Sequence, residues 1–395
     1  MKRLTKITNI PSLANLSLRE ARVFLRVDFN LPHDEKGEIK DDTRIRNSLP
    51  TIKHLLAQNT VLVLASHHSD KKQSLLPAAK RLEKLLGKPV VFMPQFWTEE
   101  TIARITSAKP GTIFMLENTR FHEGEKKNDP VLAKHFAKMA NFYINDAFGT
   151  AHRVHVSTVG LAEFLPGALG FLMEREVEEI TKTLENSQKP FVAIIGGAKV
   201  STKLGMISKL LEAADTVLLG GAVANTFFRT WGIKVGKSLI DEEAVETARS
   251  IFWKASRLHT AMILPEDVKT THAALRNEVA NVHHTYVHQD HAIYDIGEAT
   301  IRHYRKIISE AKTLVWNGPM GQYEDPKFSQ GTQKILEAVA KSKTRSLVGG
   351  GDTIANINQI KVRKQITHVS TGGGAMLELI EKGTLPALEA LRNHR

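Results

Sequence analysis

The sequence predicts a parallel α/β protein with two domains. Short apolar runs alternate with longer helix-like segments along most of the chain, and this alternation is typical of parallel sheets covered by helices. A length of 395 residues favours two domains over one. Ligands of such sheets bind beyond the carboxyl ends of the strands, so the residues that follow each apolar run are the informative ones. These residues differ in kind between the two halves of the chain.

In the first half, the apolar runs end in polar and charged residues. The runs are FLRVDFN (24–30), VLVLASHH (61–68), TIFMLENTRFH (112–122) and FYINDAFGTAHR (142–153). Arginines and histidines therefore gather at the expected strand ends, and DDTRIR (41–46) adds Arg44. Such a set suits a small, highly charged anion. Taken singly, Arg120 and Arg153 would more often be surface ion-pair residues, and Asp28 and Asn30 could simply close a turn.

In the second half, the apolar runs end in glycine. They are AIIGGAK (193–199), TVLLGGAV (216–223), TLVWNGPMG (313–321), SLVGGGDT (346–353) and THVSTGGGA (367–375). Glycine after a strand lets backbone N–H groups approach a phosphate closely, and a following helix N-terminus adds its dipole. Five such loops in one half predict a site for a nucleotide or another polyphosphate.

Lys199 and Lys203 lie four residues apart just after the first of these glycine loops. If a helix starts directly after Gly196 and Gly197, both ammonium groups lie near its first turn. A helix N-terminus already carries partial positive charge, so two cations there are unfavourable unless an anion offsets them. An isolated pair of this kind is more often a solvated pair of helix lysines. The neighbouring glycines favour the anion.

A connecting helix is expected between the two halves. In the segment 173–190, Glu176, Glu179, Ile180 and Thr183 fall at helical spacing, and no glycine or proline precedes Pro190. We therefore expect an N-terminal domain over 1–172, a connecting helix over 173–188 and a second domain over 189–380. A rigid connector between two ligand-binding halves indicates hinge closure.

The composition favours anionic partners. The formal net charge is +12, which does not by itself separate nucleic acids from phosphorylated metabolites. The chain has no cysteine, which excludes disulfides and thiol metal sites. The basic start MKRLTKITNI lacks an apolar segment typical of a secretory signal, and no apolar run approaches the roughly 20 residues that span a bilayer. These features indicate a soluble, cytoplasmic protein.

Three common nucleotide signatures do not match. The loop at 196–203 lacks the P-loop spacing of two glycines followed by Lys-Ser/Thr. The protein-kinase set of glycine-rich loop, His-Arg-Asp and Asp-Phe-Gly is absent, and so is the dinucleotide fingerprint after the first strand. A nucleotide site of another kind is left.

The sequence resembles the phosphoglycerate kinase family from about Val23 to Leu388. Eight motifs in family order carry the resemblance: RVDFNLP (26–32), DDTRIR (41–46), ENTRFHEGE (117–125), NDAFGTAHR (145–153), GGAKVSTK (196–203), WNGPMG (316–321), GGGDTIA (349–355) and STGGGA (370–375). The family implies reversible phosphoryl transfer between 1,3-bisphosphoglycerate and ADP, giving 3-phosphoglycerate and ATP, in glycolysis. It also implies two Rossmann-like domains that close about a hinge, Mg²⁺ as cofactor and a monomer.

The matching motifs imply site residues in both domains. The N-terminal domain would bind the phosphoglycerate through Asp28, Phe29, Asn30, Arg44, His67, Arg120 and Arg153. The C-terminal domain would bind the nucleotide through Lys199, Lys203, Glu324, Gly350, Gly351, Asp352 and Thr353, with Glu324 at the ribose and Asp352 at Mg²⁺. The glycines 372–374 would present a helix N-terminus to the transferred group. The residues implied in catalysis are Arg44, Lys199, Lys203, Gly350 and Gly373.

The implied chemistry needs no general base. The acceptor in the ATP-consuming direction is a carboxylate that is already ionised, so positioning and electrostatic stabilisation carry the transfer. Hinge closure would bring Arg44 to the lysines and exclude water. Asp352 could alternatively be only a helix N-cap. The family further suggests that the segment 381–395 returns to the N-terminal domain, where an amphipathic partner-binding helix is the alternative.

The sequence departs from the family pattern after His67. The family usually continues Ser-His with Leu-Gly-Arg-Pro, whereas this chain reads SHHSDKKQ (66–73) and places Ser69 and Asp70 at the glycine and arginine positions. An aspartate reverses a charge there, and Lys71 or Lys72 would not reproduce the bidentate grip of arginine. We expect activity to survive with weaker phosphoglycerate binding. Smaller departures are DIGE (295–298) and Gln322-Tyr323.

The sequence also allows three alternative interpretations. The histidines of HHTYVHQDH (283–291) invite a zinc interpretation, but an exposed connection is the simpler one. A nucleic-acid-binding protein would fit the charge of +12, yet it needs interleaved aromatics and aromatics form only 6% of the chain. A homologue with weak turnover is the alternative motivated by Asp70.

Overall fold

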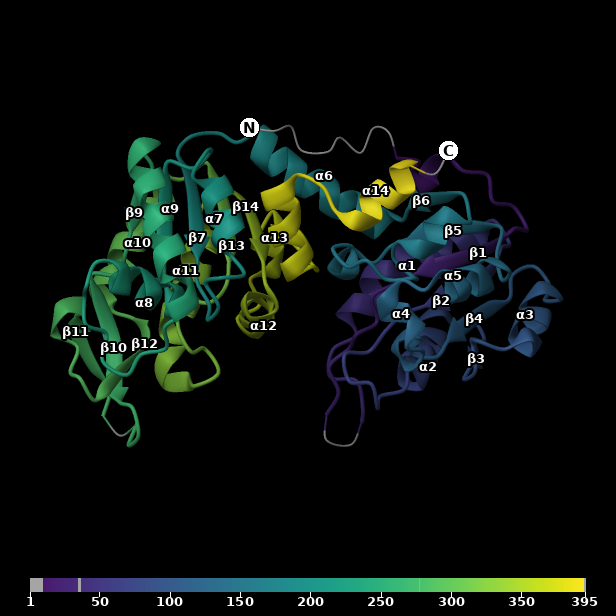
Figure 1. The fold of residues 1–395 in the computed structure, drawn as a ribbon, viewed down its shortest axis with the longest axis horizontal. Coiled ribbons are helices and arrows are strands. Elements are labelled where there is room, and N and C mark those ends of the chain that lie inside the picture. Colours follow the sequence, from purple (N-terminus) through teal and green to yellow (C-terminus); the bar gives the residue numbers. More distant parts are fainter. Residues whose placement is uncertain (1–9, 35–36, 277, 394–395) are drawn as a thin grey trace. The chain divides into compact units, whose positions relative to one another are not determined.

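The structure, a computed structural model, describes residues 10–34, 37–276 and 278–393 (Figure 1). The start of the chain, on which the expectation about a secretory signal depends, lies outside the described residues. The chain divides into two compact units. The N-terminal unit contains the described residues up to Glu178 together with those from Thr384 onward, and the C-terminal unit runs from Glu179 to Gly383. Each unit contains a six-stranded parallel sheet with helices, which confirms the predicted fold class.

The sheet of the N-terminal unit has the order β3-β4-β2-β1-β5-β6, and every pair is parallel. The chain builds outward from β1 through β2 and then adds β5 on the other side of β1, so the order reverses between β1 and β5. The strands are β1 (Arg22–Arg26), β2 (Val61–Ala65), β3 (Val91–Met93), β4 (Ile113–Leu116), β5 (Phe142–Asn145) and β6 (Gly167–Leu169). Its central strands are buried over their whole length, as expected for a parallel sheet covered on both faces.

The helices of this unit are α1 (Thr43–Ala57), α2 (Leu76–Leu86), α3 (Glu99–Thr106), α4 (Gly124–Lys127) and α5 (Pro130–Ala137). Their ends follow simple local rules. The Thr98 side chain accepts a hydrogen bond from Thr101 N at the start of α3, and the Asp129 side chain accepts one from Val131 N at the start of α5. Gly87 ends α2 in the left-handed conformation.

The sheet of the C-terminal unit has the order β15-β14-β13-β7-β8-β9, again parallel throughout. Here the order reverses between β7 and β13. The strands are β7 (Phe191–Ile195), β8 (Thr216–Leu219), β9 (Ala261–Ile263), β13 (Thr313–Asn317), β14 (Arg345–Gly349) and β15 (His368–Val369). A separate antiparallel sheet, visible at the outer side of this unit in Figure 1, comprises β10 (Asp267–His272), β11 (Ala280–His283) and β12 (His291–Ile296).

The helices of the C-terminal unit are α7 (Leu204–Leu210), α8 (Gly221–Thr230), α9 (Val245–Arg257), α10 (Glu298–Glu310), α11 (Gln330–Lys341), α12 (Gly351–Gln359) and α13 (Gly373–Lys382). Helix α7 begins at Leu204, so the expectation that Lys199 and Lys203 both lie in a first helical turn is wrong. Lys203 is the residue before the helix, and Lys199 lies in the preceding turn. Lys203, at the N-cap, still lies at the positive end of α7, so an anion near it would be favourable.

Two segments link the units. Helix α6 (Phe171–Glu185) occupies the position where the sequence predicts a connecting helix over 173–188, and the division between the units falls inside it. Helix α14 (Pro386–Asn393) belongs to the N-terminal unit, where it contacts β6 and the 3-10 helix at Gly160–Glu163. Ala387 N donates a hydrogen bond to Ala151 O at 3.1 Å. Among the described residues, no helix has the length and apolarity that crossing a membrane requires.

Candidate active site

A pocket of about 480 Å³ lies beyond the carboxyl ends of β7, β8 and β13 in the C-terminal unit. Gly197, Gly221 and Pro319 line it, and each follows one of these strands. Strands β7 and β13 are the pair at which the strand order reverses. Parallel α/β sheets bind ligands in the crevice at that point, so the topology alone assigns this pocket as a binding site.

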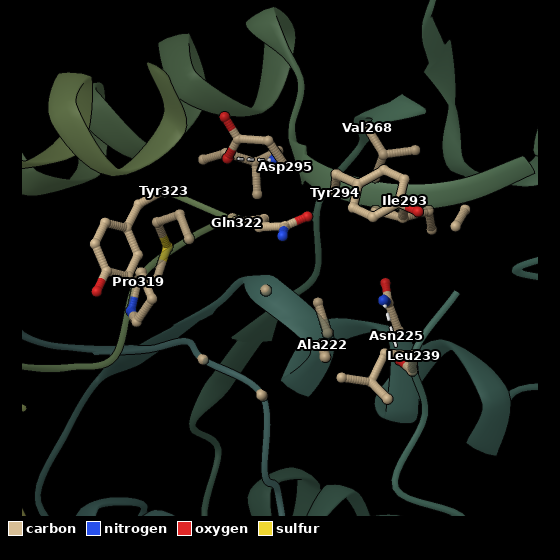
Figure 2. A pocket seen from close by; sticks show the side chains of 18 of the residues that line it. Ala222, Asn225, Leu239, Val268, Ile293, Tyr294, Asp295, Pro319, Gln322 and Tyr323 are labelled. Carbon is tan, nitrogen blue, oxygen red and sulfur yellow. Dashed lines mark hydrogen bonds between the residues drawn. The ribbon is translucent and has the colours of Figure 1, made fainter. Parts of the chain in front are cut away.

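The pocket combines apolar walls with a few polar groups. Figure 2 shows Pro319 and Tyr323 on one side of it and Asn225 and Leu239 on another. Asn225 is buried, and its amide donates a hydrogen bond to Leu239 O at 3.2 Å. Its Oδ1 has no partner among the described residues, which leaves a buried acceptor for a ligand. Apolar walls with one oriented amide suit a flat heteroaromatic group.

Lys203 is a buried cation beside this pocket. The side chain is 8% exposed, and its ammonium group donates a hydrogen bond to Gly196 O. Burial lowers the pKa of Lys203 to about 8, against the opposing attraction of Asp352. An ammonium group carries three donors, and a buried cation is stable only when paired. A bound anion would therefore stabilise the charged form of Lys203.

Glycine backbones surround the Lys203 ammonium group. Gly318 has a φ of 87°, and a Cβ there would lie 2.4 Å from Lys203 Nζ and 2.3 Å from Gly196 O. Gly350 has a φ of 105°, and a Cβ on Gly373 would lie 3.1 Å from Gly350 Cα. Side chains at these positions would fill the space that backbone N–H groups now border.

The N-termini of α12 and α13 meet at these glycines. Helix α12 begins at Gly351 and α13 at Gly373, next to the close approach of Gly373 to Gly350. Two helix N-termini directed at one place favour a phosphate there. Thr353 accepts a hydrogen bond from Gly318 N at 3.1 Å, which ties the start of α12 to the loop after β13. Asn317 Nδ2 is buried beside them without a partner in the described part of the chain.

Asp352 lies exposed in the first turn of α12 and lines the pocket. The interpretation of Asp352 as only an N-cap is wrong, because Gly350 occupies the N-cap and no side chain caps the helix. The Tyr323 hydroxyl donates a hydrogen bond to Asp352 Oδ1 at 3.2 Å. The second carboxylate oxygen is thus the one oriented away from the tyrosine.

The remaining sequence-predicted residues of this unit divide into two groups. Glu324 is exposed and lines the pocket with Asp352. Gly351 has no atom within 4 Å of a Cβ built on it, so its surroundings are open. Lys199 is exposed in the turn before α7 and does not line the pocket. Of the predicted nucleotide residues, Glu324 and Asp352 therefore line the pocket itself, and Gly350 and Thr353 lie beside Gly318, next to Lys203.

The N-terminal unit contains a different kind of site, built from charged side chains. Arg44, in the first turn of α1, forms an ion pair with Asp28 after β1. Burial alone would raise the pKa of Asp28, but Arg44, His67 and Arg26 lower it below its usual value. Burial, and then the positive charge of Arg26, lowers the pKa of His67 to about 2. His67 is therefore neutral at physiological pH.

Arg120 and Arg153 add two further cations to this cluster. Burial, followed by repulsion from Arg153 and Arg26, lowers the pKa of Arg120 to about 10. Arg120 Nε is buried and has no partner among the described residues. Burial and the same arginines also lower the pKa of His155 to about 4. Arg120 is thus held beside other cations, and an anionic ligand would offset this repulsion.

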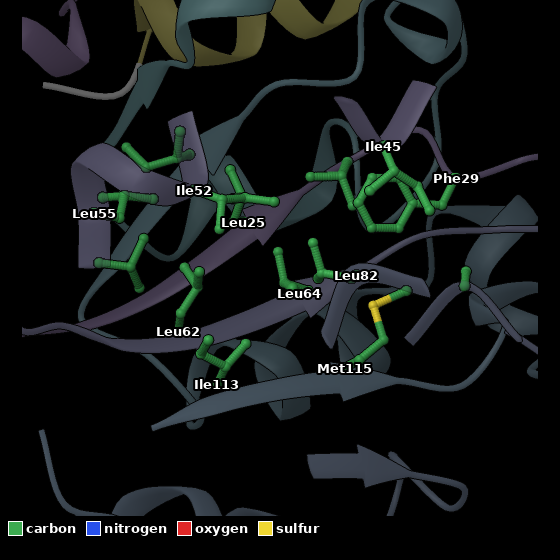
Figure 3. Close-up of a cluster of buried hydrophobic side chains, with 14 of the residues drawn as sticks. Leu25, Phe29, Ile45, Ile52, Leu55, Leu62, Leu64, Leu82, Ile113 and Met115 are labelled. Atoms are coloured by element: carbon green, nitrogen blue, oxygen red, sulfur yellow. The ribbon is translucent and has the colours of Figure 1, made fainter. Parts of the chain in front are cut away.

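Two of the predicted substrate residues serve local structure. Phe29 is fully buried in the hydrophobic core of the N-terminal unit beside Ile45 (Figure 3). The polar contact of Phe29 is made by its backbone, because Phe29 N donates a hydrogen bond to Ser66 Oγ at 2.8 Å. Asn30 exchanges two hydrogen bonds with Ser69, at 2.8 Å and 2.9 Å. Because the Phe29 side chain packs in the core, a contact of Phe29 with a substrate would involve its backbone, and the assignment of Phe29 stays a prediction.

Sequence reasoning missed Arg26, which is 1% exposed at the end of β1. Arg26 Nε donates a hydrogen bond to Ser157 Oγ at 2.8 Å, and Ser157 in turn donates to the buried Glu125. Arg26 Nη2 lies 3.1 Å from His67 Nδ1. Arginine has no acceptor, so Nδ1 must accept and the His67 proton lies on Nε2. A charged residue inside an apolar strand run, FLRV, was the available signal.

The departure at Ser69 and Asp70 forms a compact turn. The Asp70 carboxylate accepts a hydrogen bond from Lys72 N at 2.8 Å, and Asp70 N donates one to His68 Nδ1 at 3.1 Å. Both Ser69 and Asp70 are exposed. The loop is therefore ordered by its own hydrogen bonds, and weaker phosphoglycerate binding stays a prediction.

The histidines of 283–291 do not gather into a metal site. Within the described residues, no group of three or more His, Cys, Asp or Glu side chains has an arrangement that could hold a metal ion. His283 and His288 are exposed. The zinc interpretation therefore finds no support there, and the simpler interpretation of an exposed connection stands.

Comparisons with known proteins show the family to which this chain belongs. The family model described as "Phosphoglycerate kinase" matches residues 13–383. The chain is 41% identical over 396 residues to a phosphoglycerate kinase of Thermosipho africanus, covering 97% of this chain and 98% of that protein. It is also 41% identical over 398 residues to one of Thermosynechococcus vestitus, with the same coverage.

Solved structures give the same result. The chain matches a phosphoglycerate kinase from Coxiella burnetii with a TM-score of 0.84 and 37% identity, over 97% of this chain and 98% of that one. It matches one from Pyrococcus horikoshii with a TM-score of 0.86 and 32% identity, over 96% and 98% of the two chains. These similarities do not support the alternative of a homologue with weak turnover.

Proposed function

We propose, from the premise that this chain belongs to the phosphoglycerate kinase family, that its two units divide the two substrates of the family's reaction between them. The reaction is the reversible transfer of a phosphoryl group between 1,3-bisphosphoglycerate and ADP, giving 3-phosphoglycerate and ATP. The chain is therefore a kinase of glycolysis, and the proposal concerns which residues perform each part.

The observation that carries the proposal is the contrast between the two sites. The C-terminal pocket offers apolar walls, an unpaired amide oxygen on Asn225 and helix N-termini at Gly351 and Gly373. We assign the nucleotide to it, with the base against the apolar walls, the ribose at Glu324 and the phosphates at Lys203. Lys199 is exposed in the neighbouring turn and is free to reach the terminal phosphate.

We assign the phosphoglycerate to the charged cluster of the N-terminal unit. This ligand is small and carries a carboxylate and a phosphate, so it needs several cations within a short span. Arg44, Arg120 and Arg153 supply them, and arginine binds both groups in a bidentate manner. Asp28 orients Arg44 through their ion pair. Neutral His67 contributes a hydrogen bond rather than a charge.

The chemical step follows from these positions. The carboxylate of 3-phosphoglycerate attacks the terminal phosphorus of ATP, a C–O–P bond forms, and the bond from that phosphorus to the bridging oxygen breaks. The acceptor carries no proton at neutral pH, so no base is required. Negative charge on the equatorial oxygens is stabilised by Lys203, Lys199, Arg44 and the N–H groups near Gly350 and Gly373. Closure of the units about α6 would unite the two substrates and exclude water.

Mg²⁺ fits the side chains at the edge of the nucleotide pocket. Asp352 is an exposed carboxylate at that edge, and one of its oxygens is held by the Tyr323 hydroxyl. A single carboxylate suits Mg²⁺, which usually keeps several waters and takes its other ligands from nucleotide phosphates. When bound, the ion neutralises phosphate charge. We further propose that the protein acts in the cytoplasm as a monomer on small molecules, without nucleic acid or membrane partners.

Hydrogen–deuterium exchange with each ligand added alone tests the assignment. We expect 3-phosphoglycerate to protect amides of residues 26–32, 117–125 and 145–153, because its cations lie on those segments. We expect Mg-ADP to protect residues 196–205, 316–324 and 349–356. Peptides from α3 serve as the internal control, since α3 contributes no proposed ligand residue. Protection in the opposite units would overturn the assignment while leaving the activity itself intact.

A further inference from the structure

A basic groove lies at the opposite end of the C-terminal sheet from the nucleotide pocket. It has a volume of about 830 Å³ and is formed by the second half of α10, the end of α11 and the residues that lead into β13 and β14. We call it the amino-end groove, because β13 and β14 begin there. The five residues of β13 separate it from the pocket, a span of about 15 Å. Six cations line it: Arg302, Arg305, Lys306, Lys312, Lys341 and Lys343.

These six cations have no counter-ions within the protein. All are exposed, and none forms an ion pair or a side-chain hydrogen bond with any residue that the structure describes. Glu310 is the one acidic residue that lines the groove in the described chain. Elsewhere in the same unit, exposed lysines such as Lys334 and Lys382 do have glutamate partners. What distinguishes the groove is that six unpaired cations line it together with a single acidic residue.

The arrangement is unfavourable without a ligand. Arg302, Arg305 and Lys306 project from α10 at spacings of three and four residues, where like charges repel. Part of this positive charge is offset by the C-termini of α10 and α11, because a helix C-terminus carries roughly half a negative charge. Together with Glu310 they leave roughly four positive charges of the six uncompensated.

The lining also indicates the kind of ligand. The groove is lined by no aromatic residue among those described, and its apolar side chains are Ala311 and Ala338. A nucleobase would have nothing to stack on, and a protein partner would find no apolar centre. A membrane surface would find no large apolar side chain to receive. Arginine forks and lysine ammonium groups instead suit phosphate oxygens, and the volume suits a small ligand.

We propose that the amino-end groove binds a small anion that carries several phosphate groups, at a site separate from the nucleotide pocket. The groove binds the anion through Arg302, Arg305 and Lys306 of α10 on one side and through Lys341 and Lys343 on the other. The site shares no residue with the phosphoryl-transfer machinery, so it can be occupied while the enzyme turns over.

Calorimetric titration with inorganic tripolyphosphate, in buffer without Mg²⁺, tests this site. We run it with excess 3-phosphoglycerate, which occupies the arginine cluster of the N-terminal unit. The nucleotide pocket still accepts tripolyphosphate, so we expect two binding events in the unaltered protein. The triple variant R302Q/R305Q/K306Q should lose one event or weaken it at least tenfold. A second triple variant, K312Q/K341Q/K343Q, should have the same effect and covers the case in which the first fails to fold.

A matched control removes the same charge elsewhere. The variant K234Q/R257Q/K364Q replaces three exposed cations of the same unit that lie outside the groove and have no described partner. We expect it to keep both binding events, and we expect all three variants to keep kcat for 3-phosphoglycerate within about twofold. Equal binding by the groove variants and the control would overturn the proposal. So would groove-dependent binding of a uridine decamer without any groove-dependent binding of tripolyphosphate.

Discussion

The two sites bind anions by different means. In the N-terminal unit, recognition depends on charged side chains: Arg44, Arg120 and Arg153 converge with Asp28 and His67, and burial and neighbouring charges shift the pKa values of Asp28, His67 and Arg120. In the C-terminal unit, recognition depends mainly on backbone and space, since glycines clear the way to helix N-termini. Side-chain charges suit one small fixed anion, whereas a backbone cradle suits a chain of phosphates whose last group must move. Lys203 is the exception in the second site, because it is a buried charge among glycines.

The largest effect on activity is expected from replacing Lys203. Replacing Lys203 by methionine keeps most of the volume and removes the buried cation. We expect kcat to fall about 10²- to 10³-fold, as for loss of one transition-state donor. Steady-state kinetics with both substrates measure it. The control is Lys234→Met, at an exposed position in the same unit; a loss below tenfold for Lys203→Met would show that the backbone alone suffices.

A substitution at Gly318 tests the role of the glycine backbone in the C-terminal site. Gly318→Ala would place a Cβ 2.4 Å from Lys203 Nζ, and displacing that group should lower kcat/KM for Mg-ADP about 10- to 100-fold. Gly232→Ala is the matched control, because Gly232 has a φ of 73° but no atom within 4 Å of a built Cβ. Gly232→Ala should lose about 1 kcal/mol of folding free energy from backbone strain, and Gly318→Ala should lose more, because its Cβ would also meet Gly196 O at 2.3 Å. Equal activity of the two variants would contradict the cradle.

A substitution at Arg120 tests the role of the charged side chains in the N-terminal site. We expect Arg120→Gln to raise the KM for 3-phosphoglycerate about tenfold, since a hydrogen bond to a charged group is lost. The variant should keep or gain thermal stability, because repulsion from Arg153 and Arg26 is relieved. Thermal unfolding and steady-state kinetics measure the two quantities. Arg104→Gln, at an exposed position of α3, should change neither.

Asp70→Arg probes the same cluster in the opposite direction. It adds a cation at the loop where the family has an arginine, and we expect a two- to threefold lower KM for 3-phosphoglycerate, a size typical of an exposed charge. An unchanged KM would remove the idea that Ser69 and Asp70 weaken substrate binding.

A pH profile separates the two sites without mutation. The pKa of Lys203 is about 8 in the folded protein, below the usual 10.5, because burial disfavours the charged form. We expect kcat/KM for Mg-ADP to fall about fivefold between pH 8 and pH 9 as this lysine loses its proton. The same shift makes the charged lysine destabilise the fold below pH 8, and that penalty disappears as the pH rises from 8 to 10.5. An alkaline limb that persists in Lys203→Met would assign it to another group.

A further small effect is expected at Tyr323. Its hydroxyl holds one oxygen of Asp352, so Tyr323→Phe should raise the Mg²⁺ concentration for half-maximal rate about threefold, because a hydrogen bond to this solvent-exposed carboxylate is lost. Electron paramagnetic resonance of Mn²⁺ bound with ADP provides a measurement that does not depend on turnover. Tyr286→Phe, at a highly exposed position, is the control. Identical Mn²⁺ affinity in both variants would limit Tyr323 to a packing role.

Much of the fold and of the C-terminal site could be predicted from the sequence. The alternation of apolar runs and helical segments predicts the two parallel sheets, because that pattern directly reflects burial. The five glycine-ended runs predict the C-terminal pocket, because a glycine is needed wherever backbone and ligand approach closely. Gly318 and Gly350 show this directly through their positive φ values.

The rest depended on tertiary structure. Arg26 was missed because a strand pattern does not reveal which charged residue has a buried partner such as Ser157. The burial of the Phe29 side chain could not be predicted, because a motif position does not tell whether the side chain or only the backbone faces the site. The start of α7 was misplaced because the turn over Gly197 to Lys203 is stabilised by contacts with distant residues, among them Ser201 N donating to Asp241 Oδ2 at 2.9 Å.

Within the described residues the chain passes between the units twice, and this affects the order in which the N-terminal unit is completed. Helix α14 packs on β6 through buried Leu388 and Leu391, so the N-terminal unit includes residues that are synthesised after the whole C-terminal unit. Until α14 leaves the ribosome, the surface around Gly167, which Leu391 covers, stays open to solvent. A ribosome must therefore complete the C-terminal unit before the N-terminal unit can bury α14.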